Sequence, residues 1–263
     1  MKIRSRITSV VFGVIGVMGV ALIWTAFSLG DTGNARFPSL PKIFDAINDN
    51  FFNSAILAYN TFGEGGIFSN LMWTAGNVLI SVSVGVILGY VVGILLVRLQ
   101  WFRNLSSLPI AILGTIPVLV MLPFLTLWFG DSRFAMGGMV IFYTALTITE
   151  AVRSSSAHTL GRWGDYAASL GVSGTRVTLS VLLPASLPAS LGTLRAAMAF
   201  GWGFQAVAEV LGGSNGAGRL IRTFADSTNT AGVIGTLLCV GILAVLVDAI
   251  VATVGRWATR WNE

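Results

Sequence analysis

The sequence DYAASLGVSGTRVTLSVLLPASLP, residues 165–188, mixes polar and apolar side chains and lies between two long apolar runs. The polar segment RSSSAHTLGRWG, residues 153–164, leads into it. Connections in helical bundles are usually about two to eight residues long. A connection that runs from Arg153 to Pro184 is therefore too long for a simple turn, and we expect it to dock another protein.

The composition around this stretch is that of an integral membrane protein. Of the 263 residues, 54% are hydrophobic and 10% are charged, and the mean hydropathy is +0.80. Soluble domains carry about 25% charged residues, so a soluble protein of this composition could not cover its core with polar surface. The single Cys239 and the single His158 exclude a disulfide within the chain and a Cys- or His-based metal cluster. We expect no metal site in this chain.

Six apolar runs reach or approach the ~20 residues needed to cross a bilayer, and they cover residues 7–29, 71–97, 109–129, 134–152, 185–211 and 233–254. The first run resembles the start of a signal peptide, but it is about 23 residues long against ~7 to 15 for the apolar part of such a peptide. We therefore interpret it as a span. The predicted fold is all-α: one transmembrane domain over residues 1–263, with an outer loop at 30–70 and a cytoplasmic loop at 153–184.

Lysine and arginine positions predict the orientation, because these residues concentrate in cytoplasmic segments. A cytoplasmic N-terminus places most of them inside: Lys2, Arg4, Arg6, Arg98, Arg103, Arg153, Arg162, Arg176, Arg256 and Arg260. Fewer then lie outside: Arg36, Lys42, Arg133, Arg219 and Arg222. Both termini are predicted to be cytoplasmic. These charges are dispersed at span ends rather than gathered with aromatic residues on one face, so we expect no nucleic-acid partner.

The chain lacks the residues that would make it an enzyme or an energy source. No G-x-x-x-x-G-K-[ST] phosphate loop occurs in it. The segment GGSNG, residues 212–216, fits G-x-S-x-G, but a nucleophile elbow needs a preceding strand and His and Asp partners. Ser214 instead follows an apolar span and fits an outer turn. We predict no enzyme activity and no cofactor in this chain.

The predicted fifth span carries a stripe at i, i+3, i+7, i+10 and i+14, which lies on roughly one helix face: Arg195, Met198, Trp202, Gln205 and Glu209. Charged residues within spans face the bundle interior or a watery path. Asp248 lies at a depth comparable with Arg195, whereas Glu209 is about 21 Å further along the helix by the 1.5 Å rise per residue. The candidate pathway residues are Arg195, Trp202, Gln205, Glu209 and Asp248.

Two interpretations of Arg195 stay open at this point. Arg195 and Asp248 could form a buried ion pair that fixes the helix register. Alternatively, Arg195 could offer positive potential to an anion that crosses the membrane. Trp202 and Gln205 fit packing roles as well as solute contact.

The stretch from Asp165 to Pro184 resembles a motif of permease subunits of bacterial ATP-binding cassette importers: E-A-A, three residues, Gly, nine residues, I-x-L-P. Here Asp165, Tyr166 and Ala167 precede Gly171 by the same spacing, and VLLP ends at Pro184. Asp, Tyr and Val replace the Glu, Ala and Ile of the motif. The segments FPSLPKIFDAI (37–47), PVLVMLPFLTLWFGDS (117–132), SLGVSGTRV (169–177), LLPASLPASLGTLRAAMAFGW (182–202) and VAEVLGG (207–213) resemble the nitrate, sulfonate and taurine branch.

This resemblance implies a short cytoplasmic coupling helix around Asp165 to Gly171 that docks on a separate ATPase subunit. It implies that ATP and Mg are bound by that partner, that an extracytoplasmic solute-binding protein delivers the cargo, and that a second permease copy forms a homodimer in the bacterial inner membrane. The cargo expected is a small anion or polar organic solute, such as a sulfonate, nitrate or taurine. The rival interpretations are a permease for a heterocyclic or vitamin-like solute, an ion-driven secondary transporter, and a membrane-embedded assembly or sensor protein.

Overall fold

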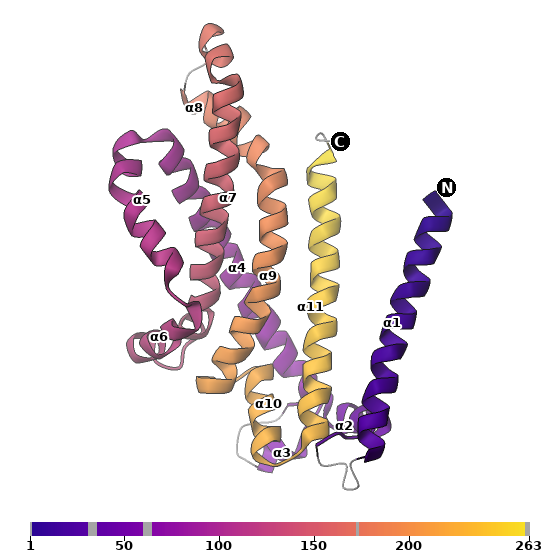
Figure 1. Cartoon of the computed structure of the whole chain (residues 1–263). Coiled ribbons are helices and arrows are strands. Elements are labelled where there is room, and N and C mark those ends of the chain that lie inside the picture. The colour runs from indigo at the N-terminus through magenta and orange to yellow at the C-terminus, as the bar shows by residue number, and fades with distance from the viewer. Residues whose placement is uncertain (1, 31–35, 60–64, 172–173, 261–263) are drawn as a thin grey trace. The chain divides into compact units, whose positions relative to one another are not determined.

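The computed structural model describes residues 2–30, 36–59, 65–171 and 174–260 (Figure 1). Within these ranges every regular element is a helix, which confirms the all-α prediction. The chain packs as two compact units, Met1–Ser69 with Leu220–Cys239 and Asn70–Arg219 with Val240–Glu263. This division does not test the prediction of a single domain, which stays a prediction.

The first unit contains α1 (Lys2–Gly30), α2 (Leu40–Asn50), α3 (Ala55–Tyr59) and parts of α10 (Ala217–Asp226) and α11 (Thr230–Ala258). The end of α1 is tied to the following segment, because Trp24 Nε1 donates to the Pro38 carbonyl at 2.9 Å. Proline in the first turn of α2 removes no needed N–H donor. The apolar face of α2 packs against the start of α11, where Ile47 lies beside Gly235.

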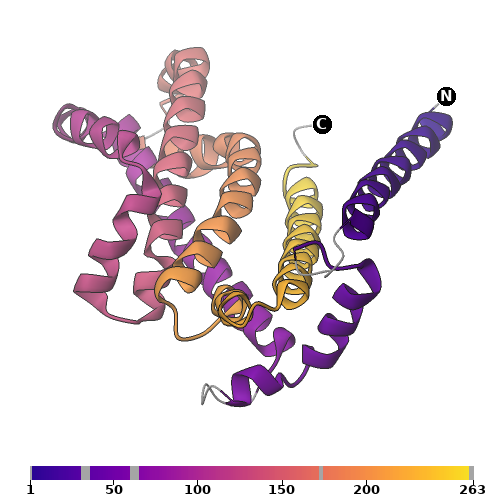
Figure 2. The ribbon, with the colours of Figure 1, turned by 60° about the horizontal axis from the view of Figure 1, so that its bottom comes forward.

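The second unit is built on three long helices: α4 (Ile67–Arg98), α7 (Arg133–Ser169) and α9 (Leu183–Gly212). Helices α7 and α9 lie side by side in both ribbon views (Figures 1 and 2). Gly85, Gly89 and Gly93 recur every four residues along α4 and face α7, so that a Cβ on Gly89 would come 2.7 Å from the Cβ of Ile148. Such a small-residue ridge lets two helix backbones approach closely in lipid.

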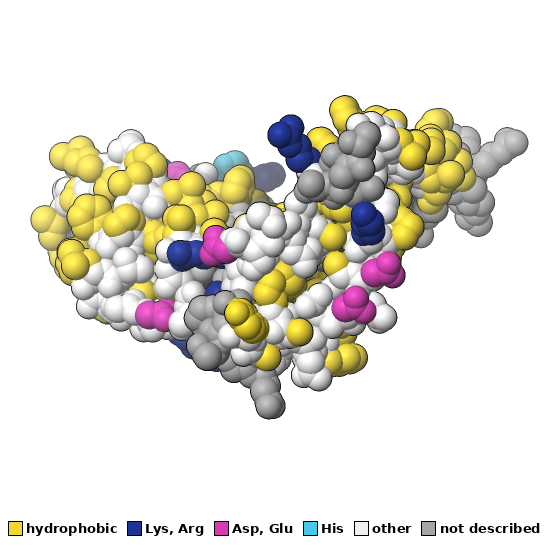
Figure 3. Space-filling view, turned by 90° about the horizontal axis from the view of Figure 1, so that it is seen from below, with side chains coloured by type: hydrophobic (Ala, Val, Ile, Leu, Met, Phe, Trp, Pro, Cys, Tyr) yellow, Lys and Arg dark blue, Asp and Glu magenta, His cyan; other side chains and the backbone are white. Residues whose placement is uncertain are grey.

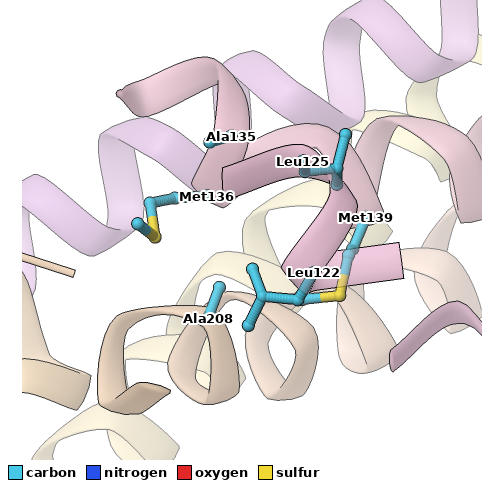
Figure 4. Close-up of a cluster of buried hydrophobic side chains, with 6 residues drawn as sticks. All are labelled: Leu122, Leu125, Ala135, Met136, Met139 and Ala208. Atoms are coloured by element: carbon cyan, nitrogen blue, oxygen red, sulfur yellow. The ribbon is translucent and has the colours of Figure 1, made fainter. Parts of the chain in front are cut away.

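The predicted span at 109–129 is not a single helix. Its residues fall in α5 (Gln100–Thr115), a 3-10 turn (Val118–Met121) and α6 (Leu122–Phe129), and the chain bends by 95° at the break. Pro117 follows α5 and has no N–H to continue a helical hydrogen-bond ladder. The bend folds α6 back onto α7 and α9, where a small apolar core forms (Figure 4): Leu122, Leu125, Ala135, Met136, Met139 and Ala208.

The described helices agree with a polytopic membrane protein. Five are long and apolar enough to cross a membrane, and the bent pair would make a sixth. The face drawn in Figure 3 carries acidic and basic side chains scattered among apolar ones. That scatter differs from the dense basic face typical of nucleic-acid-binding proteins.

Candidate coupling and translocation sites

The coupling motif begins on a long helix rather than on a short separate one. Helix α7 continues from its apolar part to Ser169, so Asp165, Tyr166 and Ala167 lie in its last turns. No proline interrupts the chain between Arg153 and Ser169, so nothing removes a backbone donor there. The expectation of a short independent helix over Asp165 to Gly171 is therefore corrected: the motif is the projecting end of α7.

The end of α7 presents a polar and an apolar surface side by side. Asp165 is exposed, and 65% of Tyr166 is accessible to solvent. Tyr166 also lines an almost wholly apolar hollow of about 220 Å³, together with Trp163, Leu170 and Val181. The tyrosine that replaces the motif's alanine therefore forms a wall of this hollow.

Gly171 ends this helical segment in a left-handed backbone conformation, with φ of +67°. Leu170 N–H still donates to the Tyr166 carbonyl, at 3.3 Å. Among the described residues, and apart from the immediate chain neighbours, no atom lies within 4 Å of the place where a Cβ would stand on Gly171. The backbone conformation, rather than crowding inside the chain, is the reason for glycine at this helix end.

A π-helical turn connects the motif to the next long helix. After α8 (Gly174–Val177), residues Thr178–Leu182 form the turn, and Leu183 N–H donates to the Thr178 carbonyl. Pro184 follows as the second residue of α9 and has no N–H to give to the turn behind it. Single π turns inside helices are frequent at functional sites. The motif therefore leads directly into the helix that carries the polar stripe.

Arg195 and Asp248 form the pair that their predicted depths suggested. Arg195 Nε donates to Asp248 Oδ1 at 2.8 Å, and Nη2 donates to Oδ2 at 2.7 Å. The pair joins α9 to α11 within the second unit. It is not buried in the chain, since 50% of the Arg195 side chain and 38% of the Asp248 side chain are exposed. Both side chains can therefore meet a lipid, a solute or another chain.

Trp202, Gln205 and Glu209 belong to a different environment at the other end of α9. All three are buried, and Gln205 and Glu209 have no exposed surface. Gln205 Nε2 donates to Glu209 Oε1 at 2.8 Å. Trp202 Nε1 and Gln205 Oε1 have no hydrogen-bond partner in the described structure. In this conformation none of the three lies on an open path.

Glu209 is the centre of a junction between α4, α9 and α10, which we call the Glu209 junction. Its Oε2 accepts from Thr74 Oγ1 and from the N–H of Gly218, both at 2.9 Å. Thr74 Oγ1 in turn accepts from Ala217 N–H at 2.9 Å. A Cβ on Gly218 would come 2.6 Å from the Glu209 Cβ, so close packing requires glycine there.

The α4 side of this junction was not predicted from the sequence. Asn70 Oδ1 accepts from Gly216 N–H at 3.1 Å, next to the Thr74 contact. A signal was present, because a polar stripe at i, i+4, i+7 and i+11 begins one residue before the second predicted span and continues into it: Asn70, Thr74, Asn77 and Ser81. The same periodicity argument that found the α9 stripe would have selected them.

These features define a class: a multi-pass helical membrane protein with a projecting helical end that leads, through a π turn, into a span with polar groups. Residues 85–260 match the family of binding-protein-dependent transport system inner membrane components. This chain belongs to that family.

The chain is similar to several permease proteins. It is 33% identical to a probable ABC transporter permease protein of Haemophilus influenzae over 58% of this chain and 64% of that one. It is 27% identical to a putative aliphatic sulfonates transport permease protein of Escherichia coli over 62% of each chain. A bicarbonate transport system permease protein of Synechococcus elongatus is 26% identical over 98% of this chain and 93% of that one. Other relatives are named for taurine, nitrate or formylaminopyrimidine. The chain thus spans less than two thirds of the first two relatives.

A solved structure shares the fold. The MetNI methionine ABC transporter, in inward-facing conformations, aligns with a TM-score of 0.63 at 20% identity, over 73% of this chain and 96% of that chain. The relatives are named as permeases, which agrees with the prediction that this chain itself carries no enzyme activity.

Proposed function

We propose that this chain is the membrane-spanning permease subunit of an ATP-driven importer, coupled to a separate ATPase through residues Asp165 to Pro184. The observation that carries the proposal is the continuity of the motif with α9. The exposed end of α7 passes through Gly171 and one π turn into the helix that holds Arg195. The family match supports the same role.

The coupling surface in this proposal consists of the last turns of α7 and the apolar hollow beside them. Asp165 offers a charge to the ATPase, Tyr166 and Ala167 offer apolar contact, and Gly171 turns the chain. Pro184 marks the point at which the segment becomes α9. ATP and Mg are bound, and ATP is hydrolysed, in the partner chain.

The free energy of ATP binding can move the permease only through a difference in interaction between two of its states. The α7 end and the π turn form a short helical link between the docking surface and α9. When two ATPases close, this link carries the displacement to the middle of the membrane. The π turn at Thr178–Leu182 lies on this link, and single π turns are frequent at functional sites.

Within the pathway we assign different tasks to the predicted residues. Arg195, with Asp248, lines the route and presents positive potential to an anion. Trp202, Gln205 and Glu209 do not line the route; they are buried and hold α9 in position. This division rests on exposure, because the Arg195–Asp248 pair is open in the chain and the other three residues are buried.

The cargo in this proposal is a small anion or polar organic solute, such as a sulfonate, nitrate or taurine. Arg195 and relatives named for sulfonates and bicarbonate support it. A heterocyclic solute is the second candidate, since one relative is named a formylaminopyrimidine transport permease protein. Native mass spectrometry of the solute-binding protein that co-purifies with this chain separates the two: a retained anion supports the first and a retained heterocycle the second.

The proposed assembly has two copies of this chain, two ATPases and one extracytoplasmic solute-binding protein in the bacterial inner membrane, with both termini of each permease in the cytoplasm. Cysteine-accessibility labelling at Trp257 and at Ser227 tests the orientation. Labelling of position 257 only from the cytoplasmic side, and of 227 only from the outside, is the expected result.

Two substitutions at Gly171 test the coupling surface. Asn adopts the left-handed conformation more readily than Ala, so Gly171→Asn keeps the helix end and adds bulk, whereas Gly171→Ala adds little bulk but strains the backbone by about 1–2 kcal/mol. If an ATPase packs closely against this point, Gly171→Asn loses co-purified ATPase and ATP-driven uptake while the chain still inserts. Retention of both by Gly171→Asn and Gly171→Ala would contradict the proposed docking surface.

A further inference from the structure

The groove between α9 and α11 in the second unit has the features of a lipid site. We propose that it binds the phosphate headgroup of an anionic phospholipid. The groove has a volume of about 380 Å³, which is within the range of small-ligand pockets, about 300–1,000 Å³. Arg195 and Arg256 line it together with Thr259. We place the phosphate at the Arg256 end of the groove, about 12 Å along α11 from Asp248, so Arg195 keeps the role on the solute route that the proposed function gives it. The inference does not depend on which solute the protein transports.

The groove is lined by positively charged side chains. Arg195 is paired with Asp248, whereas among the described residues Arg256 Nη2 donates to the neutral Thr253 Oγ1, at 3.4 Å. A second cavity, of about 660 Å³, shares Arg256 and is lined by Arg260 as well. Among the described residues that line the two cavities, none is acidic. Arginine binds phosphate oxygens with two parallel N–H donors, so an oxyanion is the ligand that this arrangement suits.

The groove is open enough to admit a headgroup. Small residues form its floor, with Gly192 on α9 and Ala252 and Gly255 on α11. Apart from the backbone of α9 itself, no atom of the described residues lies within 4 Å of the place where a Cβ would stand on Gly192, so the space above this residue is open. The Arg195–Asp248 pair joins the two helices beside this hollow, and the open space above Gly192 is where a headgroup can enter.

The surroundings of the groove favour a lipid over a free anion. Val254 and Trp257 line the second cavity and are exposed by 58% and 67%. Trp side chains gather at membrane interfaces, where one part of the ring is in lipid and the other in water. Arg256 lies two residues before the end of α11, which is where an interface is expected for a spanning helix. A phosphate at Arg256 would thus leave its acyl chains along an apolar face.

The predicted orientation agrees with this ligand. Arg256 and Arg260 lie on the side that the lysine and arginine distribution assigns to the cytoplasm. Basic pockets between spans on that side bind anionic headgroups. A lipid phosphate at Arg256 would lie about 12 Å along α11 from Asp248, and so close to the proposed solute route.

The test uses the full chain with the subunits that co-purify with it, reconstituted in vesicles of equal parts phosphatidylcholine and phosphatidylglycerol. Lipids retained after detergent extraction are counted by native mass spectrometry. Arg256→Gln removes the unpaired cation, and Gly192→Leu fills the open floor. The matched controls are Arg103→Gln, another interface arginine, and Gly203→Leu, on an exposed position of α9 with no atom near its Cβ.

The expected result is retained phosphatidylglycerol in the wild type and both controls, and roughly tenfold lower retention in Arg256→Gln and Gly192→Leu, the effect of losing one charge-assisted contact. Phosphatidylcholine retention should not change. Equal loss in Arg103→Gln, or equal retention by all variants, would overturn the proposal.

Two further outcomes would also overturn it. If soluble sulfonate or phosphate displaces the retained lipid signal at the same residues and is itself retained, the groove is a solute site. If Gly192→Leu and Arg256→Gln separate two permease copies while lipid retention per chain stays the same, the groove is a protein interface.

Discussion

Glu209 and Asp248 are both carboxylates on long apolar helices, and they lie in opposite surroundings. Glu209 has no exposed surface, and its partners are the neutral donors Thr74, Gln205 and Gly218. Asp248 is partly exposed, and its partner is the charged Arg195 beside a groove. One site is closed and complete, and the other is open and can exchange partners.

This difference in burial distinguishes polar groups that hold spans together from polar groups that can bind a ligand. A buried acceptor whose donors come from three helices fixes the positions of those helices. An ion pair beside a cavity can release either charge to a ligand without leaving a buried group unsatisfied. We therefore expect the Glu209 junction to matter through its hydrogen-bond geometry and the Arg195–Asp248 pair through its charges.

The largest expected effect is that of Glu209→Ala. The change leaves the Gln205 amide and the Gly218 N–H buried without their Glu209 acceptor, whereas the Thr74 hydroxyl can still donate to the Asn70 carbonyl at 3.0 Å. Each unsatisfied group costs about 1–3 kcal/mol, so the free energy of unfolding should fall by roughly 3 kcal/mol or more. Thermal unfolding of the purified full chain measures this. Glu150→Ala is the control, because Glu150 is exposed and pairs only within its own helix turn with Arg153.

The next largest effect is that of Thr74→Val, which distinguishes the hydrogen bonds of the Thr74 hydroxyl from the packing of its side chain. Thr74→Val keeps the volume but removes both the donor to Glu209 and the acceptor for Ala217 N–H. We expect a loss of about 2 kcal/mol, the typical contribution of a hydrogen bond to a charged group. Thr74→Ser keeps the hydroxyl and should stay close to the wild type in the same unfolding measurement. Equal losses in the two variants would show that packing, and not the hydrogen bond, holds α4 to this junction.

A charge exchange tests the open pair. The double variant Arg195→Asp with Asp248→Arg keeps an ion pair between α9 and α11 but moves the cation to the other helix. If Arg195 acts on an anion along α9, the double variant assembles normally and transports less solute than the wild type. The measurements are the amount of assembled complex and the ATP-driven uptake into vesicles. Full recovery of uptake would mean that the pair only fixes helix register.

The smallest expected effect is that of Glu209→Gln. Within the described residues the Gln205 side-chain oxygen has no partner, so its amide can turn and accept from the new NH2 group at 209. The single side-chain oxygen of the glutamine can then still accept from Thr74 and Gly218. The free energy of unfolding should therefore change by less than about 1 kcal/mol. A loss as large as that of Glu209→Ala would show that the negative charge itself is required.

The sequence predicts much of this architecture, because hydrophobic runs, charge asymmetry and helical periodicity are local properties. They indicated the apolar runs, five of which lie in long single helices, and the stripe on α9, and they left the pairing of Arg195 with Asp248 open beside a role toward an anion. The 95° bend after α5 was not predicted, since proline marks a break but not its angle. The partner of Glu209 was missed for a related reason. Thr74 is 135 residues away in the chain, and only the packing of α4 against α9 brings them together.

The coupling motif was in part predictable from the sequence and in part not. Its spacing identified the segment and its neighbours in sequence. It did not reveal that α7 continues to Ser169, because the end of a helix outside the apolar core depends on local capping rather than on hydrophobic pattern. Nor did it reveal that Gly171 adopts a left-handed backbone conformation, which favours glycine.

One measurement tests the contrast between the closed and the open site most directly: ATP-driven uptake by Glu209→Gln and Arg195→Gln, each normalised to the assembled complex in the same vesicles. We expect uptake close to the wild type for Glu209→Gln and a large loss of uptake for Arg195→Gln. Normal uptake by Arg195→Gln together with inactive, fully assembled Glu209→Gln would contradict this expectation.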